Sequence, residues 1–297
     1  MSSQERLFTA YIDLSFLKRL LRSKPDPLED LDGNWPETWR DVFSFLRQHA
    51  RVVVDGTEEE VLGDEVLTRV LLSSGLAQPK FKPGIAKQVA HGNTSIVENP
   101  FAVFLFEDCE KPLKVLRKRT GLLFLQHGDL NSRWPLLFQS HSFDVHDGEP
   151  TFGWDDLIPH AQPLNAIMVV DKYAFGQLAS PPKFAQNIGK LLLSLLPDEP
   201  PDCPIHITIV TGLKKAIGDH RHKIESLFDT ASHFLRKQTS KLNIQLRIMG
   251  FQKNQHEDRL VFTNYGMFLS GDSFDYFRED GTIRKDTLIE YIPIKGH

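Results

Sequence analysis

Short apolar runs alternate with amphipathic segments along most of the chain. In the first half, RVVVDG and FAVFLFED have the β-branched and aromatic composition of strands. PETWRDVFSFLRQHA has the spacing of an amphipathic helix with Pro36 in its first turn, and CEKPLKVLRKRTG is a helix that ends at Gly121. Strands connected by helices are typical of α/β proteins.

The alternation resumes in the second half and then changes. Two helical segments, PPKFAQNIGKLLLSLLP and DHRHKIESLFDTASHFLRKQTS, separate three strand-like runs, NAIMVVDKY, PIHITIVTG and NIQLRIMG. The strand-like runs RLVFTN and YGMFLSG follow without a helix between them. The predicted order is therefore β-α-β-α-β-β-β, in a mostly parallel sheet because helices connect the first strands.

A chain of 297 residues has room for two domains. The alternation fails over residues 131–162, which are rich in Pro, Gly, Asp and His. We therefore predict an N-terminal α/β domain over 1–130, a connecting segment over 131–162 and a C-terminal α/β domain over 163–297.

The net charge of -4 and the pI near 6.3 exclude a generally cationic nucleic-acid binder, although basic patches can exist locally. Cys109 and Cys203 lie far apart without metal-ligand spacing, which indicates a reducing compartment and argues against structural zinc. The sequence contains neither a signal peptide pattern nor an apolar run of about 18 residues. We expect a cytoplasmic protein without a transmembrane segment.

Residues 255–277 read QHEDRLVFTNYGMFLSGDSFDYF and follow the strand-like NIQLRIMG, at the end of a strand where ligands of α/β sheets bind. His256, Asp258 and Arg259, an apolar strand, Asn264 and a glycine turn resemble the motif of a phospholipase D-like domain. The similarity is to the degenerate form found at the C-termini of MIT-domain proteins and in prokaryotic conflict systems. It covers about residues 163–280.

Active phospholipase D-like enzymes carry His-x-Lys and an Asp five positions after the Lys. Carried over to this sequence, His256 keeps the position of the nucleophile, Asp258 replaces the lysine and Thr263 replaces the aspartate. An acid at the lysine position repels the phosphate that catalysis must stabilise. The resemblance therefore implies a binding domain that has lost catalysis, with Arg259 as a neighbouring cation.

Asn264 and Ser273 are predicted binding residues at the carboxyl edge of the sheet, beside His256, Asp258 and Arg259. Each has a simpler interpretation: His256 is a loop histidine, the Asp258–Arg259 pair is solvated, and Asn264 is a turn residue. The nearby aromatic residues are expected to pack in the core and at its rim instead of stacking on bases: Phe274, Tyr276 and Phe277.

Three acids follow strand-like runs in the first half. Asp13, Asp108 and Asp129 resemble the carboxylates with which a PIN-like nuclease binds Mg²⁺ or Mn²⁺. Acids at strand ends also arise as helix caps and turn residues, so the main expectation is that no cofactor is bound. Residues 1–130 are interpreted as PIN-like or as a divergent second phospholipase D-like half.

Basic residues gather on two predicted helices. Lys114 and Lys118 lie on one of them, and Lys214, Lys215 and Arg221 lie near the start of the other. Either group can follow a phosphate backbone. The alternative is that both are solubilising helix faces.

These observations lead to one functional hypothesis and one alternative. The resemblance implies a component of a bacterial system of defence against phages or mobile elements, which binds nucleic acid or a partner protein of a defence complex. The alternative is a metal-dependent or histidine-dependent nuclease or phosphodiesterase. One motif copy needs a second half to complete a site, so a homodimer or a pseudo-dimer with residues 1–150 is expected.

Overall fold

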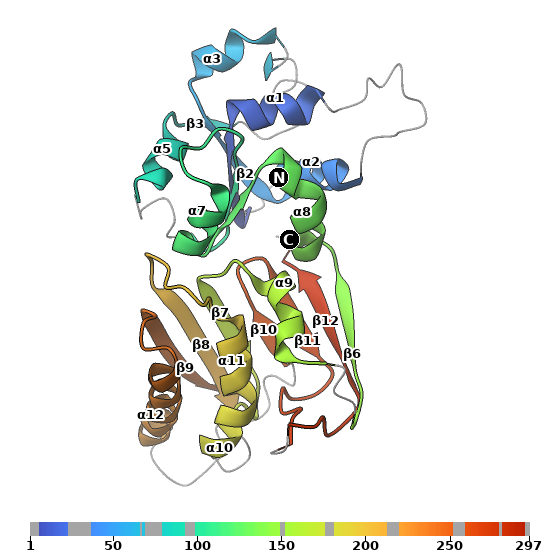
Figure 1. The fold of residues 1–297 in the computed structure, drawn as a ribbon, viewed down its shortest axis with the longest axis vertical. Coiled ribbons are helices and arrows are strands. Elements are labelled where there is room, and N and C mark those ends of the chain that lie inside the picture. Colours follow the sequence, from blue (N-terminus) through green and yellow to red (C-terminus); the bar gives the residue numbers. More distant parts are fainter. Residues whose placement is uncertain are drawn as a thin grey trace. The chain divides into compact units, whose positions relative to one another are not determined.

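The computed structural model describes residues 6–22, 37–65, 67–68, 79–92, 99–148, 152–175, 181–212, 220–251, 259–278 and 281–294. The chain divides into two compact units, Met1–Leu136 with Lys295–His297 and Leu137–Ile294. Each unit contains its own sheet and its own helices (Figure 1). The predicted class of two α/β domains is therefore confirmed. No helix of the described residues is long and apolar enough to cross a membrane.

The first unit is built on a five-stranded parallel sheet in the order β3-β2-β1-β4-β5. Every residue of β4 and β5 is buried, as expected for parallel strands that are covered on both faces. The strand order reverses between β1 and β4, so the carboxyl ends of these two strands form the topological switch point. The strands are β1 (Phe8–Asp13), β2 (Ala50–Asp55), β3 (Lys80–Phe81), β4 (Ala102–Leu105) and β5 (Leu123–Leu125).

Helices cover both faces of this sheet. Ile85 and Val89 of one helix share an apolar cluster with Leu113 and Leu116 of another, so these two helices, α5 and α7, cover the same face. α7 ends at Gly121, which has φ 63°, as the sequence predicts. The described helices of the unit are α1 (Leu14–Arg22), α2 (Glu37–Gln48), α3 (Glu58–Leu62), α5 (Ile85–Ala90) and α7 (Leu113–Thr120), with a short 3₁₀ turn over His127–Asp129. α8 (Leu130–Phe138) begins in this unit and ends in the next.

The second unit contains a seven-stranded sheet in the order β6-β12-β11-β10-β7-β8-β9. β7 pairs with β8 and β8 with β9 in parallel, but the other four pairings are antiparallel. The prediction of a mostly parallel sheet is therefore wrong. Only residues 263–265 connect β10 to β11, and so short a connection permits only an antiparallel pair. The strands are β6 (His141–Val145), β7 (Ala166–Val170), β8 (Ile205–Gly212), β9 (Ile244–Phe251), β10 (Leu260–Phe262), β11 (Gly266–Ser270) and β12 (Thr287–Pro293).

The order of elements from β7 to β11 matches the predicted β-α-β-α-β-β-β. The predicted connecting segment 131–162 differs from the structure. Within it, β6 is an edge strand paired with β12, and Trp154 is buried in the core of the second unit. Three of the five side chains of β6 are exposed, so this strand lacks the apolar alternation by which strands are recognised in a sequence.

The helices described in the second unit all pack on one face of its sheet. The inward side chains of the strands, such as Val169, Ile209 and Val261, share one apolar cluster with residues of every helix (Figure 1 shows α9 and α11 over this face). The helical segments are a 3₁₀ turn over Trp154–Leu157, α9 (Ile158–Ala161), α10 (Pro181–Phe184), a π-helical turn over Ala185–Gly189, α11 (Lys190–Leu195) and α12 (His220–Gln238). None of these described helices covers the opposite face.

Candidate functional site

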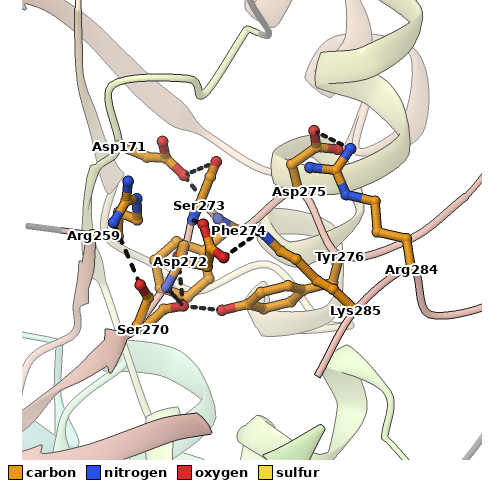
Figure 2. Close-up of polar contacts among 11 residues, drawn as sticks. Asp171, Arg259, Ser270, Asp272, Ser273, Phe274, Asp275, Tyr276, Arg284 and Lys285 are labelled. Carbon is orange, nitrogen blue, oxygen red and sulfur yellow. Dashed lines mark hydrogen bonds and ion pairs between the residues drawn. The ribbon is translucent and has the colours of Figure 1, made fainter. Parts of the chain in front are cut away.

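Asp171 lies at the carboxyl end of β7 and is fully buried. One carboxylate oxygen accepts hydrogen bonds from the Ser273 hydroxyl at 2.8 Å and from the Phe274 amide at 2.9 Å. The other oxygen accepts a hydrogen bond from the Tyr173 amide at 2.7 Å. Asp171 therefore ties the segment that follows β11 to the end of β7 (Figure 2).

Arg259 is placed next to this carboxylate by strand pairing. β10 begins at Leu260, which pairs with Val170, so Arg259 lies across from Asp171. Burial raises the pKa of Asp171, while its hydrogen bonds and the charge of Arg259 act in the opposite direction. The structure thus brings together two of the predicted site residues, Arg259 and Ser273, and joins them through an acid that the sequence did not single out.

The other charges at this edge also form pairs. The Lys285 ammonium lies 2.7 Å from a carboxylate oxygen of Asp272, and the Arg284 guanidinium lies 3.1 Å from one of Asp275 (Figure 2). The contact with Lys285 lowers the pKa of Asp272. With Arg259 beside Asp171, each cation of this cluster has an acid as a neighbour. The cluster therefore lacks the net positive charge that binds phosphate groups.

The space beside Ser273 is also small. A cavity of about 10 Å³ lies between Tyr173, Asn187, Ser273 and Asp275, which is room for about one water molecule. Asn187 fills the rest of the space, because its side chain donates a hydrogen bond to Asp275 and accepts one from the Phe277 amide. This cavity cannot hold a substrate in the described arrangement.

Two of the three neighbouring aromatic residues lie in the core, as expected. Phe274 and Tyr276 are fully buried, and Phe277 is partly buried against the same apolar cluster. The hydroxyls of Tyr276 and Ser270 are in close contact, and burial raises the pKa of Tyr276. The prediction that these rings pack, and do not stack on bases, is confirmed for Phe274 and Tyr276.

Asn264 lies at the other end of β10, away from Arg259. Its side-chain oxygen accepts hydrogen bonds from the amides of Asn165 and Ala166 at 3.1 Å, and its amide nitrogen donates to the Asn165 side chain at 2.8 Å. Asn165 and Ala166 are at the start of β7, and Asn264 is 1% exposed. The prediction that Asn264 belongs to a binding surface at the carboxyl edge is therefore wrong, because β10 runs antiparallel to β7.

Four predicted site residues lie outside the described residues: His256, Asp258, Lys214 and Lys215. For Arg221 the structure describes only the backbone, in the first turn of α12. The predictions for these residues therefore stay predictions.

Asp13 is the first of the three acids predicted as metal ligands in the first unit. It lies at the end of β1, at the topological switch point. Its side chain accepts hydrogen bonds from the Phe16 amide at 2.6 Å, the Glu107 amide at 2.6 Å and the Asp108 amide at 2.9 Å. It thereby joins the start of α1 to the segment after β4. Burial raises the pKa of Asp13 to about 6, although these hydrogen bonds oppose the rise.

Asp108 and Asp129 have different partners. Asp108 accepts a hydrogen bond from the Ser15 hydroxyl, whereas Asp129 forms an ion pair at 2.9 Å with Arg117, which also donates to the Phe124 carbonyl. Among the described residues, no group of three or more His, Cys, Asp or Glu side chains is placed to hold a metal ion. The structure therefore does not assemble Asp13, Asp108 and Asp129 into the predicted site, because each carboxylate stabilises a different local contact.

Lys114 and Lys118 are exposed on α7 and belong to a larger basic surface. β3, α5 and the turns beside them add Lys80, Lys82 and Lys87, all of them exposed, and Lys111 precedes α7. Residues 79–92 contain no acid, and residues 110–121 contain only Glu110. The excess of lysine over acid in these two segments is evident in the sequence, but the proximity of α5 to α7 becomes evident only from the fold. We call the surface formed by β3, α5 and α7 the basic face.

Comparison of the sequence with protein-family models and with curated proteins finds no match. Among solved structures, the chain is similar to TrmBL2, which is described as an archaeal chromatin protein with a novel mode of DNA binding. The sequence identity is 9% and the TM-score is 0.25, and the match covers 52% of this chain and 46% of TrmBL2. A similarity at this level supports no conclusion about fold or function.

Proposed function

We propose that this chain is a non-catalytic nucleic-acid-binding protein and that its basic face contacts the phosphate backbone. The observation that carries the proposal is the concentration of exposed lysines on β3, α5 and α7, in a chain whose net charge is -4. A local excess of lysine over acid attracts a polyanion even on an acidic protein. Four of the lysines concerned are exposed, Lys80, Lys82, Lys87 and Lys114, and a fifth, the partly exposed Lys111, precedes α7.

Two arrangements favour binding over catalysis. At the carboxyl edge of the second sheet, Asp171, Asp272 and Asp275 compensate the charges of the neighbouring cations. In the first unit, Asp129 is paired with Arg117, and Asp13 is occupied by three backbone amides. Neither arrangement supplies the cation or metal cradle that phosphoryl transfer requires.

The proposal is tested by the fluorescence anisotropy of labelled single-stranded DNA, duplex DNA and RNA at increasing salt. For duplex DNA, five phosphate contacts give a slope of about -4.5 in log K against log salt, or about a 500-fold loss of affinity between about 50 and 200 mM. Replacing Lys82, Lys87 and Lys114 by Gln removes three of these contacts. We expect this variant to lower the magnitude of the slope by about 2.7.

A matched control replaces Lys190, Lys237 and Lys241 by Gln. These residues are exposed in the second unit, and their replacement changes the net charge by the same amount. We expect the control to bind as the wild type does. Equal losses in the two variants, or no binding at about 50 mM salt, would refute the basic face as the binding surface. Cleavage of the labelled strand with Mg²⁺ or Mn²⁺ would refute the non-catalytic assignment.

The role of such binding in defence against phages or mobile elements rests on the resemblance of residues 163–280 alone. It predicts that the gene stands next to genes for nucleases, helicases or other defence components. Neighbouring genes of unrelated metabolism would remove the support for this role and would leave nucleic-acid binding to be decided by the anisotropy experiment.

A further inference from the structure

The face of the second sheet that none of the described helices covers is apolar across its centre. Strand pairing aligns Leu269, Leu260, Val170, Val210 and Met249 in one row across five adjacent strands. A second row aligns Ile292, Met267, Phe262 and Met168. Side chains alternate between the two faces of a strand, so both rows point away from the helices. We call this surface the open face.

The side chains of the open face are partly exposed. Met168 lies on β7 in the interior of the sheet and is nevertheless 37% exposed, and Met249 is 41% exposed. A sheet with one solvated face normally carries polar residues on that face. A contiguous apolar surface of this kind marks an interaction site.

We propose that the open face binds the open face of a second copy of this chain, so that the two sheets pack face to face. Two apolar sheet faces pack against each other at a spacing of about 10 Å. Seven strands about 4.8 Å apart and about 20 Å long give a face of roughly 650 Å² in projection. The accessible area of its side chains exceeds this projection, so the face approaches the roughly 800 Å² per partner of a standard interface.

The charges at the rim favour a copy of the same surface and define its orientation. Arg247 projects from the open face on β9, at one edge of the sheet, and Glu290 and Asp144 project from β12 and β6 at the other edge. A two-fold axis parallel to the strands and centred on β10 places β9 over β6 and β12 of the partner. This axis preserves the position along the strands. The row of Arg247 contains Ile292 and is adjacent to the row of Glu290 on the same face, so the long side chain of Arg247 can reach the partner's Glu290. The symmetry produces this contact twice.

The test uses sedimentation velocity of the full chain between about 1 and 100 µM, where we expect a dimer of twice 33.9 kDa. Arg247→Glu places like charges together and is expected to raise the dissociation constant at least about tenfold. Glu290→Arg is also expected to raise the dissociation constant, because it places two positive charges together. The double variant restores opposite charges and is expected to recover most of the wild-type affinity. This rescue separates a specific interface from a general loss of stability.

Lys190→Glu is the matched control, because it makes the same change in charge on an exposed residue of α11, on the helical side. It is expected to leave the dimer intact. Met168→Lys, in the centre of the open face, is expected to be a monomer by sedimentation velocity and to remain folded by circular dichroism. A wild type that remains monomeric at about 100 µM would overturn the proposal. A dimer that persists in both Arg247→Glu and Met168→Lys, or a double variant without rescue, would also overturn it.

Discussion

Asp13 allows a sharp test of how the switch point of the first sheet is held together. The side chain is 7% exposed, and two effects on its pKa oppose each other: burial disfavours the carboxylate, and three amide hydrogen bonds favour it. Burial dominates and raises the pKa from 3.8 to about 6. This shift of about two units corresponds to at most about 3 kcal/mol.

The sign of the pH dependence follows from the direction of the shift. Because the pKa of Asp13 is higher in the folded chain than in the unfolded chain, folding takes up a proton between about pH 4 and pH 6. The resulting stabilisation is fully present below the unfolded pKa and is lost as the pH rises through about 6. Asp13→Asn cannot titrate, so its stability lacks this contribution at every pH.

The measurement is urea unfolding of the wild type and Asp13→Asn at several pH values between about 4 and 7.5. In the difference between the two free energies of unfolding, the contributions of the other titrating groups cancel to first order. We expect the free energy of unfolding of the wild type to fall by about 2–3 kcal/mol relative to that of Asp13→Asn as the pH rises over this range. A constant difference, or a shift in favour of the wild type, would show that the three hydrogen bonds outweigh burial.

Two substitutions in the second unit test its packing. Gly266→Ala would place a methyl group 2.3 Å from the buried Tyr291 ring and should destabilise the chain by about 2–3 kcal/mol, measured by urea unfolding. Gly128→Ala, where no atom lies within 4 Å of the added carbon, is the matched control and should be near neutral. Asn264→Ala leaves the amides of Asn165 and Ala166 without their acceptor and should cost about 2–4 kcal/mol. An equal loss in the two glycine variants, or a neutral Asn264→Ala, would contradict these assignments.

The sequence predicts the local elements better than their pairing. The helix that ends at Gly121 and the order of elements from β7 to β11 follow from apolar spacing and from glycine, both of which are local properties. The direction of β10, β11 and β12 depends on partners far along the chain. β6 is polar enough to resemble a loop, and its pairing with β12 joins residues more than 140 positions apart.

In the candidate site, too, the residues close together in the sequence could be predicted, and the distant one could not. Arg259 and Ser273 are 14 positions apart and could be named from a short motif, but Asp171, which joins them, lies 102 positions before Ser273. The acids at strand ends are evident in the sequence, which leaves two roles open to them, that of a metal ligand and that of a helix cap or turn residue. A carboxylate that binds a metal and one that accepts backbone amides occupy the same place in the sequence, and only the positions of the neighbouring amides distinguish them.

These strand-end carboxylates explain why binding is proposed on the outer surfaces. In a parallel sheet, the N-terminus of the next helix presents amides without partners, and in nucleotide-binding proteins a ligand phosphate accepts their hydrogen bonds. Here Asp55, at the end of β2, accepts hydrogen bonds from the amides of Gly84, Ile85 and Ala86, and Asp13 binds amides of its own. The chain therefore fills with its own carboxylates the positions where a phosphate would bind. An anionic partner would have to displace a hydrogen-bonded acid at these positions, whereas at Lys80, Lys82, Lys87 and Lys114 of the basic face it meets exposed ammonium groups.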